Sequence, residues 1–224
     1  MRRLNSLLSA CIIGLCFSAW ALAVSSATTL SQPAANNAPA SITISPEAAQ
    51  ARSKAQAAQR IATQASRKAV KAAEEALALA AQAGAGNNAY YGETNSLGYR
   101  YQGLWQKVRG IRVYNGLGIL SWPNRNRYEG KFVKGHKSGN GVFTGPNGDH
   151  YEGEWQREIN GHGKYVYPNG ESYAGEFSNG VRQGFGVLTY PNGERYEGEW
   201  RNNQKSGYGV QTNRQGVVEY AGIW

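Results

Sequence analysis

A short sequence word, Tyr-x-Gly-x-aromatic, recurs along the C-terminal part of the chain and constrains the fold more than any other feature. It begins at Tyr101, Tyr128, Tyr151, Tyr173, Tyr196 and Tyr220, at intervals of 27, 23, 22, 23 and 24 residues. Self-similarity at a near-constant period is typical of repeat architectures, in which each unit is one supersecondary element. The spacing of this motif therefore gives the length of one unit in a repeat protein.

Each unit has the chemistry of a β-hairpin. Tyr, Gly and the aromatic residue fall on one face of a strand, and the charged residues between them fall on the other. A Gly-x-Gly follows in the second strand and leaves room for a ring over bare backbone. Three units close with Pro-Asn-Gly, at Pro146, Pro168 and Pro191, and Asn179-Gly180 is a further hairpin signal; Asn and Gly tolerate the positive φ of such turns.

These hairpins are expected to pair with one another, because a single hairpin is not stable alone. The predicted fold class is mostly β: one elongated antiparallel sheet of tandem β-hairpin repeats over 101–224, preceded by a long Ala-rich α-helix. The residues expected to build the sheet are Tyr101, Gly103, Trp105, Tyr128, Gly130, Phe132, Tyr151, Gly153, Trp155, Tyr173, Gly175, Phe177, Tyr196, Gly198, Trp200, Tyr220, Gly222 and Trp224.

The repeat resembles that of the MORN (membrane occupation and recognition nexus) family, whose unit reads Tyr-x-Gly-x-Trp followed by Gly-x-Gly. The likeness covers Tyr101–Trp224. The Tyr101 unit departs by its greater length, and the Tyr151 unit has Glu158 in place of the mid-turn glycine. The resemblance implies that the Tyr, Gly and Trp positions are structural, and that the sheet is a membrane-associated or assembly platform.

A long helix is predicted over 45–84. Ser45 is a typical N-cap, Pro46 suits the first helical position, and Gly84 ends the run of helix formers. Small residues alternate at spacings of three and four, at Ala48, Ala51, Ala55, Ala58, Ala62, Ala65, Ala69, Ala72, Ala76, Leu79 and Ala83. This seam favours a coiled coil and hence a homo-oligomer; a lone solvated spacer helix is the alternative.

The N-terminal segment is predicted to be a targeting signal. Arg2 and Arg3 precede an uncharged apolar run that ends at Ala23, which predicts a signal peptide over 1–23. An uncleaved membrane anchor and a lipoprotein signal are the alternatives. Both cysteines, Cys11 and Cys16, lie in this segment. Residues 24–44 and 85–100 are expected to be linkers, the first of them disordered, and the expected compartment is the periplasm.

Basic residues are concentrated early in the repeat region. Nine of them lie between 100 and 137, against the single acid Glu129: Arg100, Lys107, Arg109, Arg112, Arg125, Arg127, Lys131, Lys134 and Lys137. From 138 to the end there are seven bases and ten acids. The basic stretch indicates binding to anionic lipid or cell-wall polymer rather than to nucleic acid. Solvated strand faces are the alternative.

No enzyme, cofactor or metal site is expected. Glu152 and Glu154, like Glu197 and Glu199, are interpreted as solvent-facing repeat surface. The histidines at 136, 150 and 162 lack the spacing of a zinc site. The predicted function is a non-enzymatic cell-envelope scaffold that binds a protein partner or an anionic membrane surface. The alternative is a peptidoglycan- or glycan-binding module with stacked aromatic residues, which requires the Trp155 and Trp200 rings to be exposed.

Overall fold

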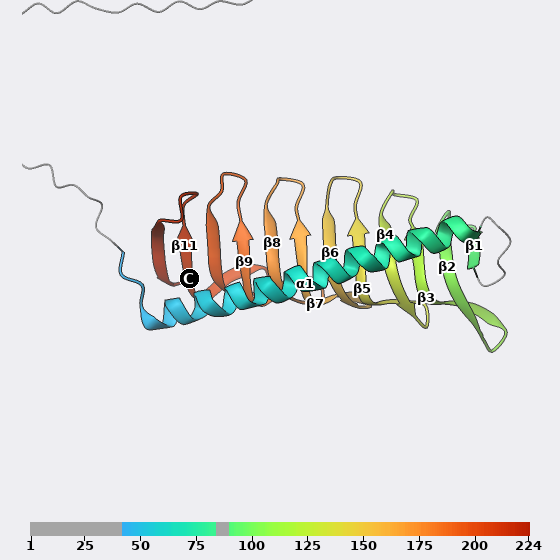
Figure 1. Ribbon diagram of the computed structural model, residues 1–224, viewed down its shortest axis with the longest axis horizontal. Coiled ribbons are helices and arrows are strands. Elements are labelled where there is room, and N and C mark those ends of the chain that lie inside the picture. The colour runs from blue at the N-terminus through green and yellow to red at the C-terminus, as the bar shows by residue number, and fades with distance from the viewer. Residues whose placement is uncertain (1–41, 84–89) are drawn as a thin grey trace, which may run out of the picture. The chain divides into compact units, whose positions relative to one another are not determined.

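The computed structural model describes residues 42–83 and 90–224, which all belong to one compact unit spanning Ala40–Trp224 (Figure 1). The predicted signal peptide at 1–23 and most of the predicted 24–44 linker lie outside the described residues. The described part consists of one long helix and one antiparallel sheet.

The sheet has twelve strands that neighbour each other in sequence order. They are β1 (Tyr90–Thr94), β2 (Arg100–Val108), β3 (Ile111–Ser121), β4 (Arg127–Val133), β5 (His136–Thr144), β6 (His150–Gln156), β7 (Glu158–Val166), β8 (Ser172–Ser178), β9 (Val181–Thr189), β10 (Arg195–Arg201), β11 (Gln204–Thr212) and β12 (Val218–Ile223). The predicted fold class is confirmed. The predicted 85–100 linker is corrected, because it contains β1, which pairs with β2.

The two kinds of turn follow the predicted chemistry. Asn179 and Gly180 both have positive φ, 50° and 82°, and join β8 to β9 as a tight hairpin. On the opposite edge, the Asn169 side chain of a Pro-Asn-Gly turn accepts a 3.0 Å hydrogen bond from the Glu171 amide. Arg157 alone connects β6 to β7, which accounts for the shorter Tyr151 unit.

On one face of the sheet, each repeat tyrosine lies over glycine. The Tyr151 hydroxyl donates a hydrogen bond to the Glu154 carbonyl at 3.0 Å. The Tyr128, Tyr173 and Tyr196 hydroxyls each donate to the carbonyl three residues farther along the chain. A Cβ atom added to Gly153 or to Gly163 would lie 2.5 or 2.4 Å from the Tyr151 oxygen. The ring therefore requires bare backbone on both strands, and the tyrosines at 101, 128, 151, 173 and 196 are fully buried.

The other face of the sheet is covered by α1 (Pro46–Ala83), which runs across the strands from β11 toward β1 (Figure 1). Its 38 residues span about 57 Å at ~1.5 Å each. Twelve strands about 4.8 Å apart span about 53 Å, so one helix covers the whole row. Among the described residues, no helix is long and apolar enough to cross a bilayer.

The alanine seam packs on this sheet, which corrects its interpretation as a coiled-coil interface. The buried alanines are Ala48, Ala51, Ala55, Ala58, Ala62, Ala65, Ala69, Ala73 and Ala76. Val142 of β5 clusters with Ala69 and Ala73, because small side chains let the helix approach the sheet closely. The stripe shifts from Ala72 to Ala73, as expected of a straight helix with 3.6 residues per turn rather than a supercoil with 3.5.

Candidate functional site

On the face that carries the repeat tyrosines, Lys and Arg side chains lie over tryptophan rings in a row. Lys137 Nζ lies 4.3 Å from the Trp155 ring centroid, and Lys205 Nζ lies 4.0 Å from that of Trp224. The Arg182 guanidinium lies 4.4 Å from the Trp200 centroid. In each case the cation comes from one unit and the ring from the next. Such contacts strengthen as the cation loses water, and burial lowers the pKa of Lys137 and of Lys205.

Two units carry Phe instead of Trp, and in each case the preceding unit has an uncharged residue at the position equivalent to Lys137, Arg182 and Lys205. Tyr114 takes the place of the cation before Phe132, with the two ring centroids 5.8 Å apart. Ile159 takes it before Phe177 and packs against the same aromatic cluster. The choice between Trp and Phe is thus tied to the residue supplied by the neighbouring unit.

The tryptophans of the row are buried. Trp155 and Trp200 are 3% and 4% exposed. Their Nε1 atoms donate hydrogen bonds to the Gly141 and Gly186 carbonyls at 3.0 and 3.2 Å. These rings are therefore closed to stacking on sugar, which the glycan-binding alternative required of them.

A second aromatic row, half-buried, remains accessible on this face. Its members are Trp122, Phe143, Tyr165, Tyr167 and Tyr190, which pack against the buried cluster. A hollow of about 220 Å³ opens there among three neighbouring units, lined by Lys137, Phe143, Trp155, Glu158, Ile159, Tyr165 and Gly180. This row is the aromatic surface on which a partner could bind.

The helix-covered face holds glutamates that sequence reasoning had placed in solvent. Glu197 is only 2% exposed. Its carboxylate accepts hydrogen bonds from Arg52 Nε at 2.5 Å and Gln56 Nε2 at 3.1 Å, and Arg195 lies 3.3 Å away. The prediction failed because the covering helix comes from a segment more than 100 residues earlier.

Glu152 has a similar role farther along the helix. It accepts a short hydrogen bond from Ser66 Oγ and interacts with His150 Nε2 at 2.9 Å. Burial raises the pKa of Glu152, but the hydrogen bonds from Ser66 and His150 and the charges of His150 and Lys164 outweigh it and hold the pKa below its usual value. Glu152 is therefore also a helix-docking residue.

The other repeat glutamates stabilise backbone irregularities. Glu154 accepts a hydrogen bond from the His162 amide at 2.8 Å, opposite the register shift between Gly153 and Trp155. Glu176 and Glu199 accept equivalent bonds from the Phe185 and Tyr208 amides at 3.1 and 3.2 Å. Glu154 and Glu199 thus also support the fold, although the Glu154 side chain is 45% exposed, and neither of the two glutamate pairs forms one carboxylate cluster.

The repeat geometry agrees with a family model. The model for the MORN repeat matches residues 113–127, 128–150, 151–172, 173–195 and 196–218. Residues 113–218 of the sheet are MORN repeats. The first match begins in the second strand of the Tyr101 unit, which is the stretched unit.

Solved structures offer only distant likeness to this MORN sheet. The Drosophila melanogaster SAS-4 (dCPAP) TCP domain, solved with a proline-rich motif of Ana2 (dSTIL), is 14% identical with a TM-score of 0.28, and covers 60% of this chain and 90% of its own. The TCP10 domain of Danio rerio CPAP is 12% identical with a TM-score of 0.17, and covers 62% and 92%. Scores this low say nothing about the partners of this protein. No curated protein matches the sequence.

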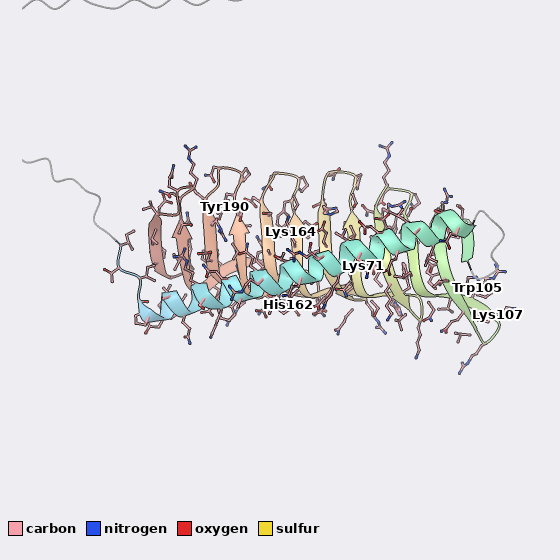
Figure 2. All side chains as sticks on the ribbon, viewed as in Figure 1. Lys71, Trp105, Lys107, His162, Lys164 and Tyr190 are labelled. Carbon is pink, nitrogen blue, oxygen red and sulfur yellow. The ribbon has the colours of Figure 1, made fainter. Side chains whose placement is uncertain are left out.

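The nine predicted basic residues do not gather on one surface of the MORN sheet. Lys137 is half-buried on the aromatic face, Arg127 pairs with Glu129 at 2.6 Å, and Arg112 lies 4.9 Å from the Trp105 ring centroid. Arg125 lies at the Pro-Asn-Gly edge, and Arg100 and Lys131 are exposed within strands. The remaining three, Lys107, Arg109 and Lys134, lie at or beside the tight hairpin tips. Figure 2 shows Lys107 near the first of these tips.

Arg157, outside the predicted stretch, completes a row with these tips. Arg109, Lys134 and Arg157 open the first three tight turns after β2, β4 and β6. Because these turns recur every second strand on one edge, the Lys134 and Arg157 tips are about 9.6 Å apart. The β2–β3 hairpin is longer and carries Arg109 farther out. We call Lys107, Arg109, Lys134 and Arg157 the basic edge; all four are exposed.

The backbone at these tips favours other residues. Arg109, Lys134 and Arg157 have φ of 49°, 48° and 69°, whereas the corresponding positions of the last two tight turns carry Asn179 and Asn202, with φ of 50° and 49°. Asn adopts this left-handed region far more readily than Arg or Lys. The repeated use of a cation at an unfavourable position indicates a role at the surface rather than in the fold.

The described residues contain no group of three or more His, Cys, Asp and Glu side chains able to hold a metal ion. His162 lies 3.8 Å from Glu154, and His150 interacts with Glu152. Both histidines thus have places in the repeat framework.

Proposed function

We propose that this protein is a non-enzymatic scaffold of the cell envelope that attaches to an anionic surface through its basic edge. The observation that carries the proposal is the row of three cations at turn positions where the backbone favours Asn. Its placement in the envelope rests on the positive start and apolar run of residues 1–23. Fractionation of cells that express the tagged chain tests that placement.

The arrangement suits a flat negative surface. Hairpin tips are the outermost points of a sheet edge, so several can reach one plane at the same time. Each Lys or Arg near an anionic membrane contributes about 1 kcal/mol, and the attraction decays within a Debye length. Four exposed cations then give binding that is reversible and sensitive to salt. Phospholipid headgroups and acidic wall polymers both present such charge.

A protein partner on the half-buried aromatic row is the second candidate. Units recur every two strands, about 9.6 Å. A polyproline II peptide repeats every three residues, about 9.3 Å, and such peptides bind aromatic-lined grooves. A peptide lying across the strands could therefore meet an equivalent aromatic slot in each unit. Titration with a fluorescent (Pro-Pro-Glu)₅ peptide, in parent and Tyr165→Ala, tests this: binding lost in the variant supports it, and no binding to the parent rejects it.

The membrane proposal is tested by co-sedimentation of the chain from Val24 with vesicles containing phosphatidylglycerol. The test variant is Arg109→Asn, Lys134→Asn and Arg157→Asn together. Since Asn suits the left-handed turn, this variant is expected to fold at least as well as the parent. The control is Arg60→Gln, Lys68→Gln and Lys71→Gln, which removes three exposed charges from α1.

We expect the parent to bind at low salt and to dissociate at high salt. The tip variant should bind at least tenfold more weakly, while the helix control should bind within twofold of the parent. Equal losses in both variants would mean that only net charge matters, and this would reject the basic edge as the site. Binding to neutral vesicles that is independent of salt would contradict the proposal as well.

A further inference from the structure

The second position of each Tyr-x-Gly word forms a row of side chains beneath α1. In the middle of the sheet, cross-strand register places Glu152, Lys164, Ala174, Val187 and Glu197 next to one another in that order. Of the three residues in this row that occupy the second position of a Tyr-x-Gly motif, two carry a carboxylate that faces the helix. The unit between them carries Ala174, which has no group beyond Cβ.

The helix presents a matching line of polar side chains. Arg52, Gln56, Gln59, Thr63 and Ser66 follow one another at spacings of four, three, four and three, and so lie along one side of α1. Arg52 and Gln56 bind the Glu197 carboxylate, and Ser66 binds that of Glu152. Gln59 and Thr63 occupy the middle of the line, over the unit that lacks an acid.

A hollow of about 340 Å³ lies at this place, between α1 and strands β7 to β9. Its lining consists of Gln59, Thr63, Ser66, Arg67, Lys164, Ser172, Ala174, Val187 and Thr189. The set includes two cations, one amide and four hydroxyl groups, but no carboxylate. Lys164 is an exposed residue of β7 that lies on the sheet beside the helix (Figure 2).

We propose that this hollow is a binding site for a small oxyanion, a carboxylate or phosphate group of a ligand, which takes the place that Glu152 and Glu197 fill in the neighbouring units. Lys164, the direct cross-strand partner of Ala174, supplies the principal charge. Arg67 adds a second charge, and the hydroxyls of Ser172 and Thr189 supply hydrogen bonds, whereas that of Thr63 already donates to the Gln59 carbonyl at 2.8 Å. Ionised acceptors make the stronger hydrogen bonds with such donors.

The flanking units support this chemistry because each carries a side-chain carboxylate of its own, Glu152 or Glu197, at this position. Glu197 is buried and Glu152 half-buried at the same row position, and each is satisfied by donors from α1 and the sheet. At the central unit the Ser172 and Thr189 hydroxyls and the Lys164 ammonium group line the hollow, and no carboxylate does. An added anion would therefore complete a pattern that the fold repeats on both sides. This site opens at the side of the helix, where Thr63, Arg67 and Lys164 are exposed. It lies apart from the hairpin tips of the basic edge and does not depend on the proposed attachment to a membrane.

The site is tested by NMR titration of the ¹⁵N-labelled chain from Val24 with inorganic phosphate and, separately, with acetate. Sodium chloride at equal ionic strength is the reference. We expect saturable shifts of the Thr63, Lys164 and Ala174 amides with at least one of the two oxyanions and not with chloride. Comparison of phosphate with acetate distinguishes the two kinds of oxyanion.

Two variants make the assignment specific. Ala174→Glu installs the carboxylate of the neighbouring units, and should fold and abolish the shifts. Lys164→Gln should weaken binding about tenfold, the effect of one charge-assisted hydrogen bond. Ala78→Glu adds the same charge on an exposed helix position and should change the affinity less than twofold. Shifts that persist unchanged in Ala174→Glu and Lys164→Gln, or no saturable shift in the parent, would overturn the proposal.

Discussion

The ammonium group of Lys137 lies 4.3 Å from the centre of the Trp155 ring, although the two residues belong to different repeats. The same relationship joins Arg182 to Trp200, whereas Ile159 is followed by Phe177. Neighbouring hairpins thus share more than backbone hydrogen bonds. Each unit specifies which aromatic ring the next one accepts.

This coupling predicts a rescue. Phe177→Trp alone should lower the free energy of unfolding by about 1–3 kcal/mol, because the larger ring is forced against Ile159. The double variant with Ile159→Lys should recover most of that loss, since it recreates the Lys137–Trp155 arrangement. Urea denaturation of the parent, both single variants and the double variant gives the coupling energy. Strictly additive effects would show that the two positions are independent.

Removal of Arg52 should loosen the helix from the sheet. Loss of one partner of a buried ion pair costs about 3–5 kcal/mol, and we expect about 2–3 kcal/mol for Arg52→Ala because Arg195 still faces Glu197. Thermal denaturation measures the loss, and hydrogen exchange should show faster exchange in the first turns of α1. Arg60→Ala, an exposed position on the same helix, is the control and should change stability by less than about 0.5 kcal/mol.

Acid should weaken the protein through Glu152. The pKa of this group is lower in the folded state than its ordinary value of 4.5. A depressed carboxyl pKa contributes stability above the unfolded pKa, and this contribution is lost as the pH falls through the folded value. The difference in urea midpoint between the parent and Glu152→Gln should therefore be full at pH 6 and shrink below about pH 4.5. A difference that stays constant down to pH 3 would contradict the assignment.

A single methyl group should disrupt one unit. In Gly153→Ala the added Cβ would lie 2.5 Å from the Tyr151 hydroxyl and 2.6 Å from Gly163 Cα, and the second contact is with backbone that cannot rotate away. We expect a loss of about 2–4 kcal/mol, of the size seen when strain is forced into a packed core. Adding Tyr151→Phe removes the clashing oxygen but not the backbone contact, so it should restore little of the melting temperature.

Much of the sheet was predictable, because its determinants are local. Tyr, Gly and Trp at alternate positions set the aromatic face, and Asn179-Gly180 set a turn, so the hairpins followed from spacing alone. The register shifts after Gly103, Gly130, Gly153, Gly175 and Gly198 did not. The roles of Tyr151 and Gly163 could be inferred from the need for a ring over bare backbone. The burial of Trp155 also agrees with its place in the repeat, although sequence left its exposure open.

The position of α1 was not predictable in the same way, because an alanine stripe suits a second helix and a flat sheet equally well. One signal was present: a polar line from Arg52 to Ser66 beside the stripe, which a solvated spacer does not need. The glutamates could not be placed without the position of α1, since Glu197 would be exposed on an uncovered sheet and is buried on a covered one. Arg157 was missed because it lies outside the run of basic residues and joins the others only through the turn.

The match in length between α1 and the row of strands has a consequence for how such a chain can change. A duplicated repeat would lengthen the sheet by about 9.6 Å, which corresponds to about six helical residues. Without a matching insertion of nearly two turns in α1, the new unit would leave its acid-bearing face in water. A change in the number of repeats is therefore expected to be accompanied by a matching change in the length of the helix.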